Sequence, residues 1–467
     1  MFSRDAFRAL RRRRALCVAP ALPVGFPVGS GSAGSADDTN IADGGNGVTI
    51  GRVASVLAEE TGLCATLRAP ADLPRGARDF EAFLAAGDFA LCVVLHAFKC
   101  GDALDALAEV RGSGHQDVKV VLVLGGTDVN VDAREAPERA ATLARRAASA
   151  DVVVAFSPSM VAAAPEGALP PTTAIVPQGV RLPSRGFDGF RRPSATETTT
   201  TIAFNSEEAK EEDAVPSLHD ALGVPRSTPV FLLPAGLRPV KDVLWAADAA
   251  EERVKGLVSK SSSSPAFVLA VIGPSLDAPY ASLVAQKARA SASEGAGAFT
   301  RMPPVARHVA LEYMRAAAGV LNTSLSEGQS GALLEAAAAG TPVLARDIPG
   351  NRALLDMLEE AAGGADPGGP ERERERDPNA FRDDFFDDAH ARPLLAAFAH
   401  PCGFLFASPE TLAEAMASLA EDSELGSSVR RAAGRAVDRA RRGAEELARR
   451  EREGWRGIAA GLFAGEK

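Results

Sequence analysis

The chain has 467 residues, of which 46% are hydrophobic and only 5% aromatic, and its formal net charge is −10. This length is enough to bury large cores in two or three domains. The acidic balance argues against nucleic acid or an anionic membrane as a partner, because neither would be attracted at long range. We expect small-molecule partners, no nucleic acid, and no transmembrane segment, since no run of about 18 apolar residues is present.

The basic start of the chain, MFSRDAFRALRRRRALCVAPALPVG, has two interpretations. It is either a targeting segment followed by a short apolar region, or the lead into a first buried strand at ALCVAPAL, residues 15–22. The five cysteines show no CxxC and no zinc-like spacing, and Cys92 lies in an apolar run typical of a buried thiol. These features favour a reducing, cytoplasmic location, with organelle targeting as the alternative.

Short, continuously apolar segments alternate with Ala-rich helical patterns through most of the chain. Continuous apolar runs are typical of parallel strands that are covered on both faces, and the helical patterns between them indicate repeated strand-helix-strand units. We predict an α/β fold with two Rossmann-like parallel-sheet domains facing across a cleft. The predicted strands are 89–95, 118–124, 151–156, 174–176, 229–233, 267–272, 319–321 and 342–345.

Two polar stretches interrupt this alternation and suggest the domain boundaries. Residues 184–217 are rich in Ser, Thr, Glu and Pro and read as a solvated linker or insertion. The second stretch, DPGGPERERERDPNAFRDDFFDDAH at 366–390, has Asp pairs that resemble a metal cluster, but such charge runs are usually solvated loops. The predicted parts are an N-terminal domain at 1–183, a second domain at 218–445 with a disordered insertion at about 356–400, and a C-terminal helix at 446–467.

Polar and glycine-rich motifs follow the predicted strands. In open parallel sheets, ligands bind at the carboxyl ends of the strands, where loops and helix N-termini converge with unpaired N–H groups. The motifs are GGNG (44–47), His96 with Lys99, GGTD (125–128), GLRPVK (236–241), GPSLD (273–277) and SLSEGQSG (324–331).

The stretch SEGQSGALLE is the most informative of these motifs. Gly328 and Gly331 let the backbone pass close to a ligand, and a helix beginning near Ser330 directs free N–H groups at an anion. Glu327 and Glu335 then approach the same ligand from two sides, as carboxylates that bind vicinal hydroxyls. The alternative is that both glutamates only complement the helix N-terminus.

Two cations at the end of another predicted strand favour the first interpretation. Arg238 and Lys241 lie in GLRPVK and can neutralise phosphates. A glutamate pair for hydroxyls, a helix N-terminus and two cations together describe a nucleotide-sugar site.

EGQSGALLE, with seven residues between its glutamates, followed by AAAAGTPVLARDIPGN, resembles the signature of retaining family-4 glycosyltransferases of the GT-B fold. LPAGLRPVKD, VIGP, GVLNTSLSEG, GFLF, GGNGVTIGR and LGGTDVN extend the resemblance over most of the chain apart from the two insertions. The combination of GGTDVN, PAGLRPVKD and LARDIPGN is similar to the glycosyltransferase 1 domain-containing protein 1 group.

The resemblance implies a donor-binding second domain. There, Glu335 would hold the donor ribose and Glu327 would approach the sugar, with Glu327 and Lys241 counted as catalytic. The groups that would stabilise the departing diphosphate are the amides of Gly328, Gln329, Ser330 and Gly331 with the side chains of Arg238 and Lys241. The chain departs from the family in one respect: the arginine lies only three residues before the lysine, which makes its role less certain.

The resemblance also implies an acceptor-side first domain. His96 resembles the histidine that lines the reaction centre, although a lone histidine at a strand end is more often structural. Thr127 and Asp128 would lie on the acceptor side. Gly45, Asn46 and Gly47 would approach the donor phosphates or the acceptor.

The function predicted on these grounds is transfer of a sugar from a nucleotide-sugar donor to an unknown acceptor, with retention and without a metal or other cofactor. Two alternatives stay open, a sugar-nucleotide epimerase of the same fold and a catalytically idle sugar-nucleotide-binding protein. An oxidoreductase is disfavoured, because no GxGxxG is followed by an acidic residue about twenty positions on.

Overall fold

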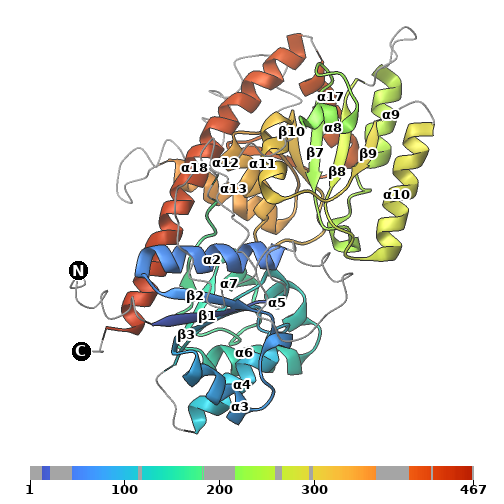
Figure 1. Cartoon of the computed structure of the whole chain (residues 1–467). Helices are drawn as coiled ribbons and strands as arrows, with labels where there is room; N and C mark the ends of the chain where they lie inside the picture. The colour runs from blue at the N-terminus through green and yellow to red at the C-terminus, as the bar shows by residue number, and fades with distance from the viewer. Residues whose placement is uncertain are drawn as a thin grey trace. The chain divides into compact units, whose positions relative to one another are not determined.

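The computed structural model divides into two compact units (Figure 1). The first unit runs to Gln178 and resumes at Ala448, and the second comprises the described residues from Gly179 to Leu447. Each unit is an α/β structure around one sheet, which confirms the predicted fold class. The residues described are 13–20, 45–113, 118–180, 182, 216–257, 266–293, 298–363, 399–421 and 424–464.

The first unit contains a parallel six-stranded sheet in the order β2-β1-β3-β4-β5-β6. Because β2 lies on one side of β1 and β3 on the other, the strand order reverses between β1 and β3. The early strand expected within 15–22 is confirmed by β1. The strands are β1 (Arg14–Val18), β2 (Cys64–Arg68), β3 (Phe89–Leu95), β4 (Lys119–Val123), β5 (Val152–Ala155) and β6 (Ala174–Ile175).

Helices cover both faces of this sheet. In Figure 1, α3, α4 and α6 lie together below it and α2 lies above it. Their buried apolar residues and those of the strands form one continuous core, which also includes Trp455 near the end of the chain. The helices are α2 (Gly45–Thr61), α3 (Ala77–Ala86), α4 (Gly101–Gly112), α5 (Gly126–Asn130), α6 (Pro137–Ser149) and α7 (Pro158–Ala163).

The second unit contains a seven-stranded sheet in the order β12-β13-β11-β10-β7-β8-β9. All neighbouring pairs are parallel except β12 with β13. The order reverses between β7 and β10, because the chain goes out through β8 and β9 and then returns to the other side of β7. The strands are β7 (Val230–Pro234), β8 (Val268–Ile272), β9 (Phe299–Met302), β10 (Gly319–Asn322), β11 (Val343–Arg346), β12 (Ala399–His400) and β13 (Gly403–Phe406).

The central strands of this sheet are buried on both faces. Phe231 and Leu233 of β7 pack into one core cluster, and Val230 and Leu232 of the same strand pack into another. Successive side chains of a strand point to opposite faces, so two helical layers are needed to cover them. This is why the strands read as continuous apolar runs. The helices are α8 (Leu218–Leu222), α9 (Ala247–Leu257), α10 (Ala278–Ser293), α11 (Arg307–Ala316), α12 (Gly331–Ala339), α13 (Pro349–Ala362), α17 (Pro409–Ala420) and α18 (Glu424–Leu462).

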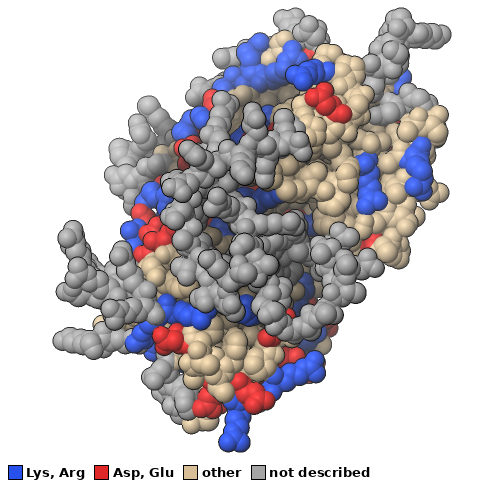
Figure 2. All heavy atoms as spheres, in the orientation of Figure 1, with Lys and Arg blue, Asp and Glu red and all other residues tan. Residues whose placement is uncertain are grey.

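The last helix, α18, differs from the C-terminal helix expected at 446–467. It is one continuous helix of 39 residues whose first part belongs to the second unit and whose part from Ala448 belongs to the first. Its buried stripe is made mainly of alanines, and arginines occupy much of its exposed face. Figure 2 shows Lys and Arg side chains gathered over its first turns.

The two predicted insertions are only partly covered by the described residues. Helix α13 continues to Ala362, so the insertion expected to begin at about 356 begins later. Its charged stretch at 366–390, and nearly all of the linker at 184–217, lie outside the described residues. Among the helices that the structure describes, none has the length and apolar character needed to cross a membrane.

Candidate functional site

The reversal of strand order in the second unit brings two predicted residues together. Lys241 lies in the loop after β7, and Glu327 lies in the loop after β10. These loops are joined by hydrogen bonds from Leu325 N to Val240 O (2.9 Å) and from Thr323 Oγ1 to Lys241 O (3.0 Å). In open α/β sheets the crevice for ligands forms at such a reversal, outside the carboxyl ends of the strands. The lysine and glutamate, 86 positions apart, therefore meet where the topology favours a ligand.

Three side chains donate hydrogen bonds to the same oxygen of Glu327. Lys241 Nζ lies 2.5 Å, Ser324 Oγ 2.7 Å and Asn322 Nδ2 3.0 Å from Glu327 Oε1. Burial by itself raises the pKa of Glu327, but the Lys241 ammonium and the three hydrogen bonds outweigh it and hold that pKa below its ordinary value. Glu327 is therefore an ionised carboxylate fixed in one orientation and paired with a cation.

Helix α12 begins where the sequence predicts. Ser330 is its N-cap, and its hydroxyl accepts from Leu333 N at 3.4 Å. A side chain at Gly331 would meet no atom within 4 Å, so the first turn is open on that side. Gly328 and Gln329 lie in the loop between Glu327 and the cap. The amides at this helix start thus lie in sequence directly after the fixed carboxylate.

Glu335 lies on the second turn of α12 and has a different partner. Arg307 Nε, at the start of α11, is 2.7 Å from Glu335 Oε1. The glutamate side chain is 15% exposed and that of the arginine 42%. Both glutamates are thus engaged by cations, Glu327 by Lys241 and Glu335 by Arg307, so complementing the helix N-terminus is not their only interaction.

Arg238 ends up at the same edge of the sheet but in another environment. It precedes the turn Pro239–Lys241, and its Nε is buried with no hydrogen-bond partner among the residues that the structure describes. A buried donor without a partner is costly. Arg238 is therefore a cation at this edge whose Nε has a hydrogen-bonding capacity that no described residue uses.

The first unit holds a second predicted group at the ends of two neighbouring strands. His96 follows β3, and Thr127 and Asp128 lie in the turn after β4. His96 Nδ1 is 2.6 Å from Asp128 Oδ1, and His96 Nε2 is 2.6 Å from Thr127 Oγ1. Nδ1 thus faces the Asp128 carboxyl and Nε2 faces the Thr127 hydroxyl, and the main-chain N–H groups of Lys99 (3.2 Å) and Phe98 (3.4 Å) also approach Nδ1.

The surroundings of this group hold it firmly. Asp128 is fully buried and accepts main-chain hydrogen bonds from Ala97 (3.0 Å), Phe98 (3.3 Å) and Gly125 (2.7 Å). His96 has a φ of 82°, a left-handed conformation that is uncommon for a side chain of this size. Such conformations persist where the surrounding structure imposes them, and they cluster at functional sites.

Asp132 completes an arrangement that the sequence did not indicate. Its Oδ2 is 3.7 Å from His96 Nε2, and its Oδ1 is bound by Arg139 at 3.0 Å. Ligand atoms of His96, Asp128 and Asp132 lie within 4.8 Å of one another, close enough for a cation to bridge. The histidine nitrogens, however, already hydrogen-bond to Asp128 and Thr127.

Gly45, Asn46 and Gly47 form the first turn of α2. This helix follows β1, next to the reversal of strand order in the first unit. One turn further on, Arg52 binds Glu451 Oε1 at 2.7 Å and Gln178 Oε1 at 2.9 Å. The predicted glycine motif is therefore at a helix N-terminus at the carboxyl end of a strand, while Gly44 lies outside the described residues.

Sequence reasoning missed several residues that shape these two groups. Asn322 and Ser324 stand in the quoted motif GVLNTSLSEG, and their place at the end of β10 was a usable signal. Arg307 and Asp132 had no such signal, because their partners come from other elements.

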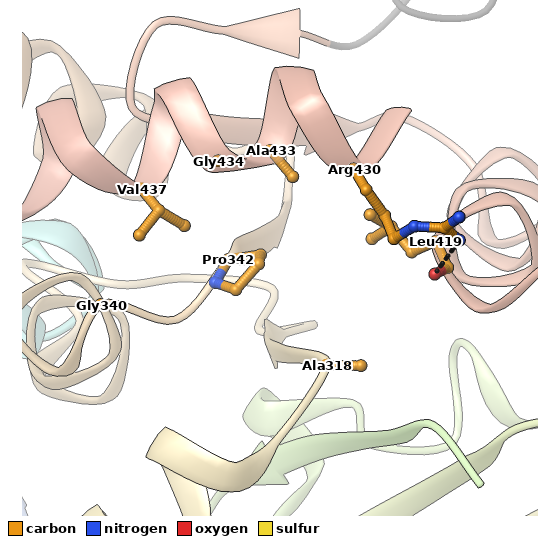
Figure 3. A pocket seen from close by; sticks show the side chains of 8 residues that line it. All are labelled: Ala318, Gly340, Pro342, Leu419, Arg430, Ala433, Gly434 and Val437. Carbon is orange, nitrogen blue, oxygen red and sulfur yellow. Dashed lines mark hydrogen bonds between the residues drawn. The ribbon is translucent and has the colours of Figure 1, made fainter. Parts of the chain in front are cut away.

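The described cavity in Figure 3, of about 340 Å³, lies at the amino ends of β10 and β11, opposite the motifs. It is lined by Ala318, Gly340, Pro342, Leu419, Arg430, Ala433, Gly434 and Val437.

The fold agrees with comparisons to known proteins. The two α/β units have the fold of GT-B glycosyltransferase structures. Residues 228–365, which lie within the second unit, match the family described as glycosyl transferases group 1.

One curated relative matches a larger part of the chain. It is the glycosyltransferase 1 domain-containing protein 1 of Xenopus tropicalis, 29% identical over 244 residues. The match covers 50% of this chain and 58% of that protein. The chain thus matches less than two thirds of the length of this relative.

Solved structures of low sequence identity share the fold. Sucrose-phosphate synthase from Thermosynechococcus elongatus superposes with a TM-score of 0.57 at 14% identity, covering 97% of this chain and 98% of that one. Anabaena HepE in complex with UDP and glucose gives a TM-score of 0.54 at 15% identity, covering 97% and 100%. At these identities the likeness concerns the fold.

Proposed function

We propose that the protein transfers a sugar from a nucleotide-sugar donor to an acceptor hydroxyl, with retention at the anomeric carbon, as in family-4 glycosyltransferases. The observation that supports this most directly is the Lys241–Glu327 pair at the strand reversal of the second unit, next to the open first turn of α12. UDP-hexoses are the first donors to test, because the similar fold of HepE binds UDP and glucose.

The donor diphosphate would bind to the amides at the start of α12 and to the side chains of Arg238 and Lys241. Arg238 has a buried N–H to offer, and the helix N-terminus favours an anion. Charge neutralisation by these groups needs no metal ion. Glu335 would accept hydrogen bonds from the ribose hydroxyls, as the resemblance of EGQSGALLE to the family-4 signature implies.

The reaction breaks the bond between the anomeric carbon and the β-phosphate oxygen, and the electron pair leaves with the diphosphate. The acceptor oxygen forms the new bond from the same face, and its proton passes to the leaving diphosphate. Cations and amides fixed before the reaction stabilise the charge as it develops. Glu327 would act at the sugar, and the resemblance gives His96, held by Asp128 and Thr127, a role in the reaction as well.

Three substitutions separate these roles. Glu335→Ala should weaken the binding of the intact donor and of the free nucleoside diphosphate alike, by roughly 1.5–3 kcal/mol, the value of a charged hydrogen bond. Glu327→Ala should leave diphosphate affinity almost intact while turnover falls, because its contribution is realised as the bond breaks. Lys241→Ala should reduce both the affinity for the diphosphate and the turnover.

The experiment is a thermal-shift screen of UDP-, GDP- and ADP-sugars, followed by calorimetry and turnover with the best donor. A donor at 100 times its dissociation constant raises stability by about 2.7 kcal/mol. The anomeric configuration of the product, read by NMR, tests retention. Isomerisation of the donor in the absence of any acceptor would indicate an epimerase instead. Binding of a nucleotide sugar without turnover in the presence of any acceptor tested would indicate a catalytically idle binding protein.

A further inference from the structure

Two buried asparagines lie behind the Glu327 carboxylate. Asn322 is the last residue of β10 and is 6% exposed, and Asn351, in the first turn of α13, is fully buried. Asn351 Nδ2 donates to Asn322 Oδ1 at 3.1 Å. Asn322 Nδ2 in turn donates to Glu327 Oε1 at 3.0 Å and to Ser330 Oγ at 2.9 Å. A chain of amides thus joins α13 to the fixed carboxylate and to the N-cap of α12.

Main-chain groups determine the orientation of both amides. Ser324 N–H can only donate, and it lies 3.1 Å from Asn322 Oδ1. The Arg346 carbonyl can only accept, and it lies 3.0 Å from Asn351 Nδ2. Neither asparagine can therefore flip without losing a main-chain hydrogen bond. The Asn322 NH₂ group is forced to face Glu327.

The arrangement is not optimal for stability. Asn351 Oδ1 is buried and has no hydrogen-bond partner among the described residues, and such an acceptor costs stability. The start of α13 is also packed closely on the Glu327 loop, since a Cβ at Gly350 would lie 2.1 Å from Glu327 O. An apolar residue at 351 would avoid the unpaired acceptor, but it would lose the donor that fixes Asn322.

We propose that Asn322 and Asn351 are positioning residues for the sugar-transfer site. Asn351 holds the Asn322 amide in one orientation, and Asn322 holds the Glu327 carboxylate and the Ser330 cap together. A flipped Asn322 would present its oxygen to Glu327 Oε1, and two acceptors at that distance repel. The inference rests on the proposed function in taking Glu327 as the residue that acts at the sugar.

Three substitutions test it: Asn322→Asp, Asn322→Leu and Asn351→Leu. Asn322→Asp puts an acceptor where a donor faces Glu327, Asn322→Leu removes the donor, and Asn351→Leu leaves Ser324 N–H alone to orient Asn322. Turnover should therefore fall in that order, by about 100-fold for the first and about 10-fold for the last, as for outer residues that orient a catalytic group. Affinity for the nucleoside diphosphate should stay within about twofold, because the change acts on the sugar end.

A pH profile separates positioning from a purely structural role. Asn322 helps to hold the pKa of Glu327 low, so losing its donor raises that pKa. The acid limb of the turnover profile should move to higher pH in both Asn322 variants. Unchanged acid limbs, or turnover losses that follow the unfolding midpoints and not the predicted order, would overturn the proposal. If a variant does not fold, Asn351→Ser, which keeps a hydroxyl donor, takes its place and should retain most of the turnover.

An independent measurement covers the case in which the wild-type protein turns over no nucleotide sugar. The Glu327 carboxyl can then be titrated by carbon-13 NMR, with Glu327→Gln to assign its signal. A raised pKa in the Asn322 variants supports positioning even if the proposed reaction is wrong. If the wild-type protein is active and the pKa of Glu327 is unchanged in the Asn322 variants, the positioning role is rejected while the proposed function stands.

Discussion

Asp128 in the first unit and Glu327 in the second are both carboxylates near the carboxyl end of a parallel strand, but different groups hold them. Asp128 accepts hydrogen bonds from three main-chain amides and lies 2.6 Å from His96 Nδ1. Glu327 is held by the side chains of Lys241, Asn322 and Ser324. Amides of a folded loop cannot turn to water, and neither can the buried Asn322 amide, whereas the Lys241 ammonium, on a side chain that is 20% exposed, can.

This difference predicts which property each residue controls. Removing Asp128 leaves several buried donors without an acceptor, so the loop itself should lose stability. Removing Glu327 leaves a lysine that is 20% exposed and can be hydrated, so chemistry should suffer more than folding. The two tryptophans of the chain allow a direct comparison, since Trp455 lies in the core of the first unit and Trp245 packs against a core of the second.

The largest effect on stability is expected for Asp128→Ala. Unfolding of the first unit should become easier by about 3–5 kcal/mol, because the acceptor of three buried main-chain amides and the neighbour of His96 Nδ1 are lost together. Denaturation followed by Trp455 fluorescence in a Trp245→Phe background measures it. Asp128→Asn is the matched control and should cost less. A first unit as stable as the wild type would contradict the importance of main-chain donors.

A smaller effect is expected for Lys241→Met, which leaves Glu327 without its cation. The second unit should lose about 2–3 kcal/mol, less than for a fully buried pair, because water reaches both groups. Trp245 fluorescence in a Trp455→Phe background follows this unit. The double variant Lys241→Met with Glu327→Gln should recover part of the loss. If the double variant is as unstable as the sum of the single ones, the pair does not interact energetically.

The ion pair of Glu327 with Lys241 should also appear in the pH dependence of stability, with a smaller effect than that of Lys241→Met. Because the pKa of Glu327 in the folded protein lies below its ordinary value of 4.5, the pair stabilises fully above that value and loses its contribution as the pH falls through the lower one. The difference in stability between the wild type and Glu327→Gln should therefore be constant near neutral pH and shrink below about pH 5. A difference that grows with acid would mean that the pKa of Glu327 is raised instead.

The smallest effect is expected for the exposed ion pair between Arg307 and Glu335 in the second unit. Arg307→Ala breaks an ion pair with Glu335 in which the arginine is 42% exposed, so stability should change by no more than about 1 kcal/mol. Diphosphate affinity should fall far less than in Glu335→Ala. Calorimetry on both variants checks this. Equal losses of affinity would show that Arg307 itself binds the ligand.

How far the sequence predicts the molecule depends on where a residue lies in each sheet. Every predicted strand exists, and all of them except β6 lie inside their sheets, where parallel strands are buried on both faces and are continuously apolar. The strands β2, β9, β12 and β13 were missed. Three of them lie at an edge of their sheet and β13 lies next to one, and the burial patterns of β2 and β9 expose three and two of their residues in part. The extent of α18 was also missed, because its amphipathic pattern runs without a break through residue 445, where the second domain was expected to end.

The sequence by itself determined the local features of the site. The serine cap and the glycines of α12 act over a few residues, and the placement of motifs after apolar strands predicted the correct edge of each sheet. Only the tertiary structure decided which side chains meet. The pairing of Lys241 with Glu327, of His96 with Asp128 and of Asn322 with Asn351 depends on which strands and helices become neighbours. Strand order is set by long-range packing of both sheet faces, and no local pattern of residues encodes it.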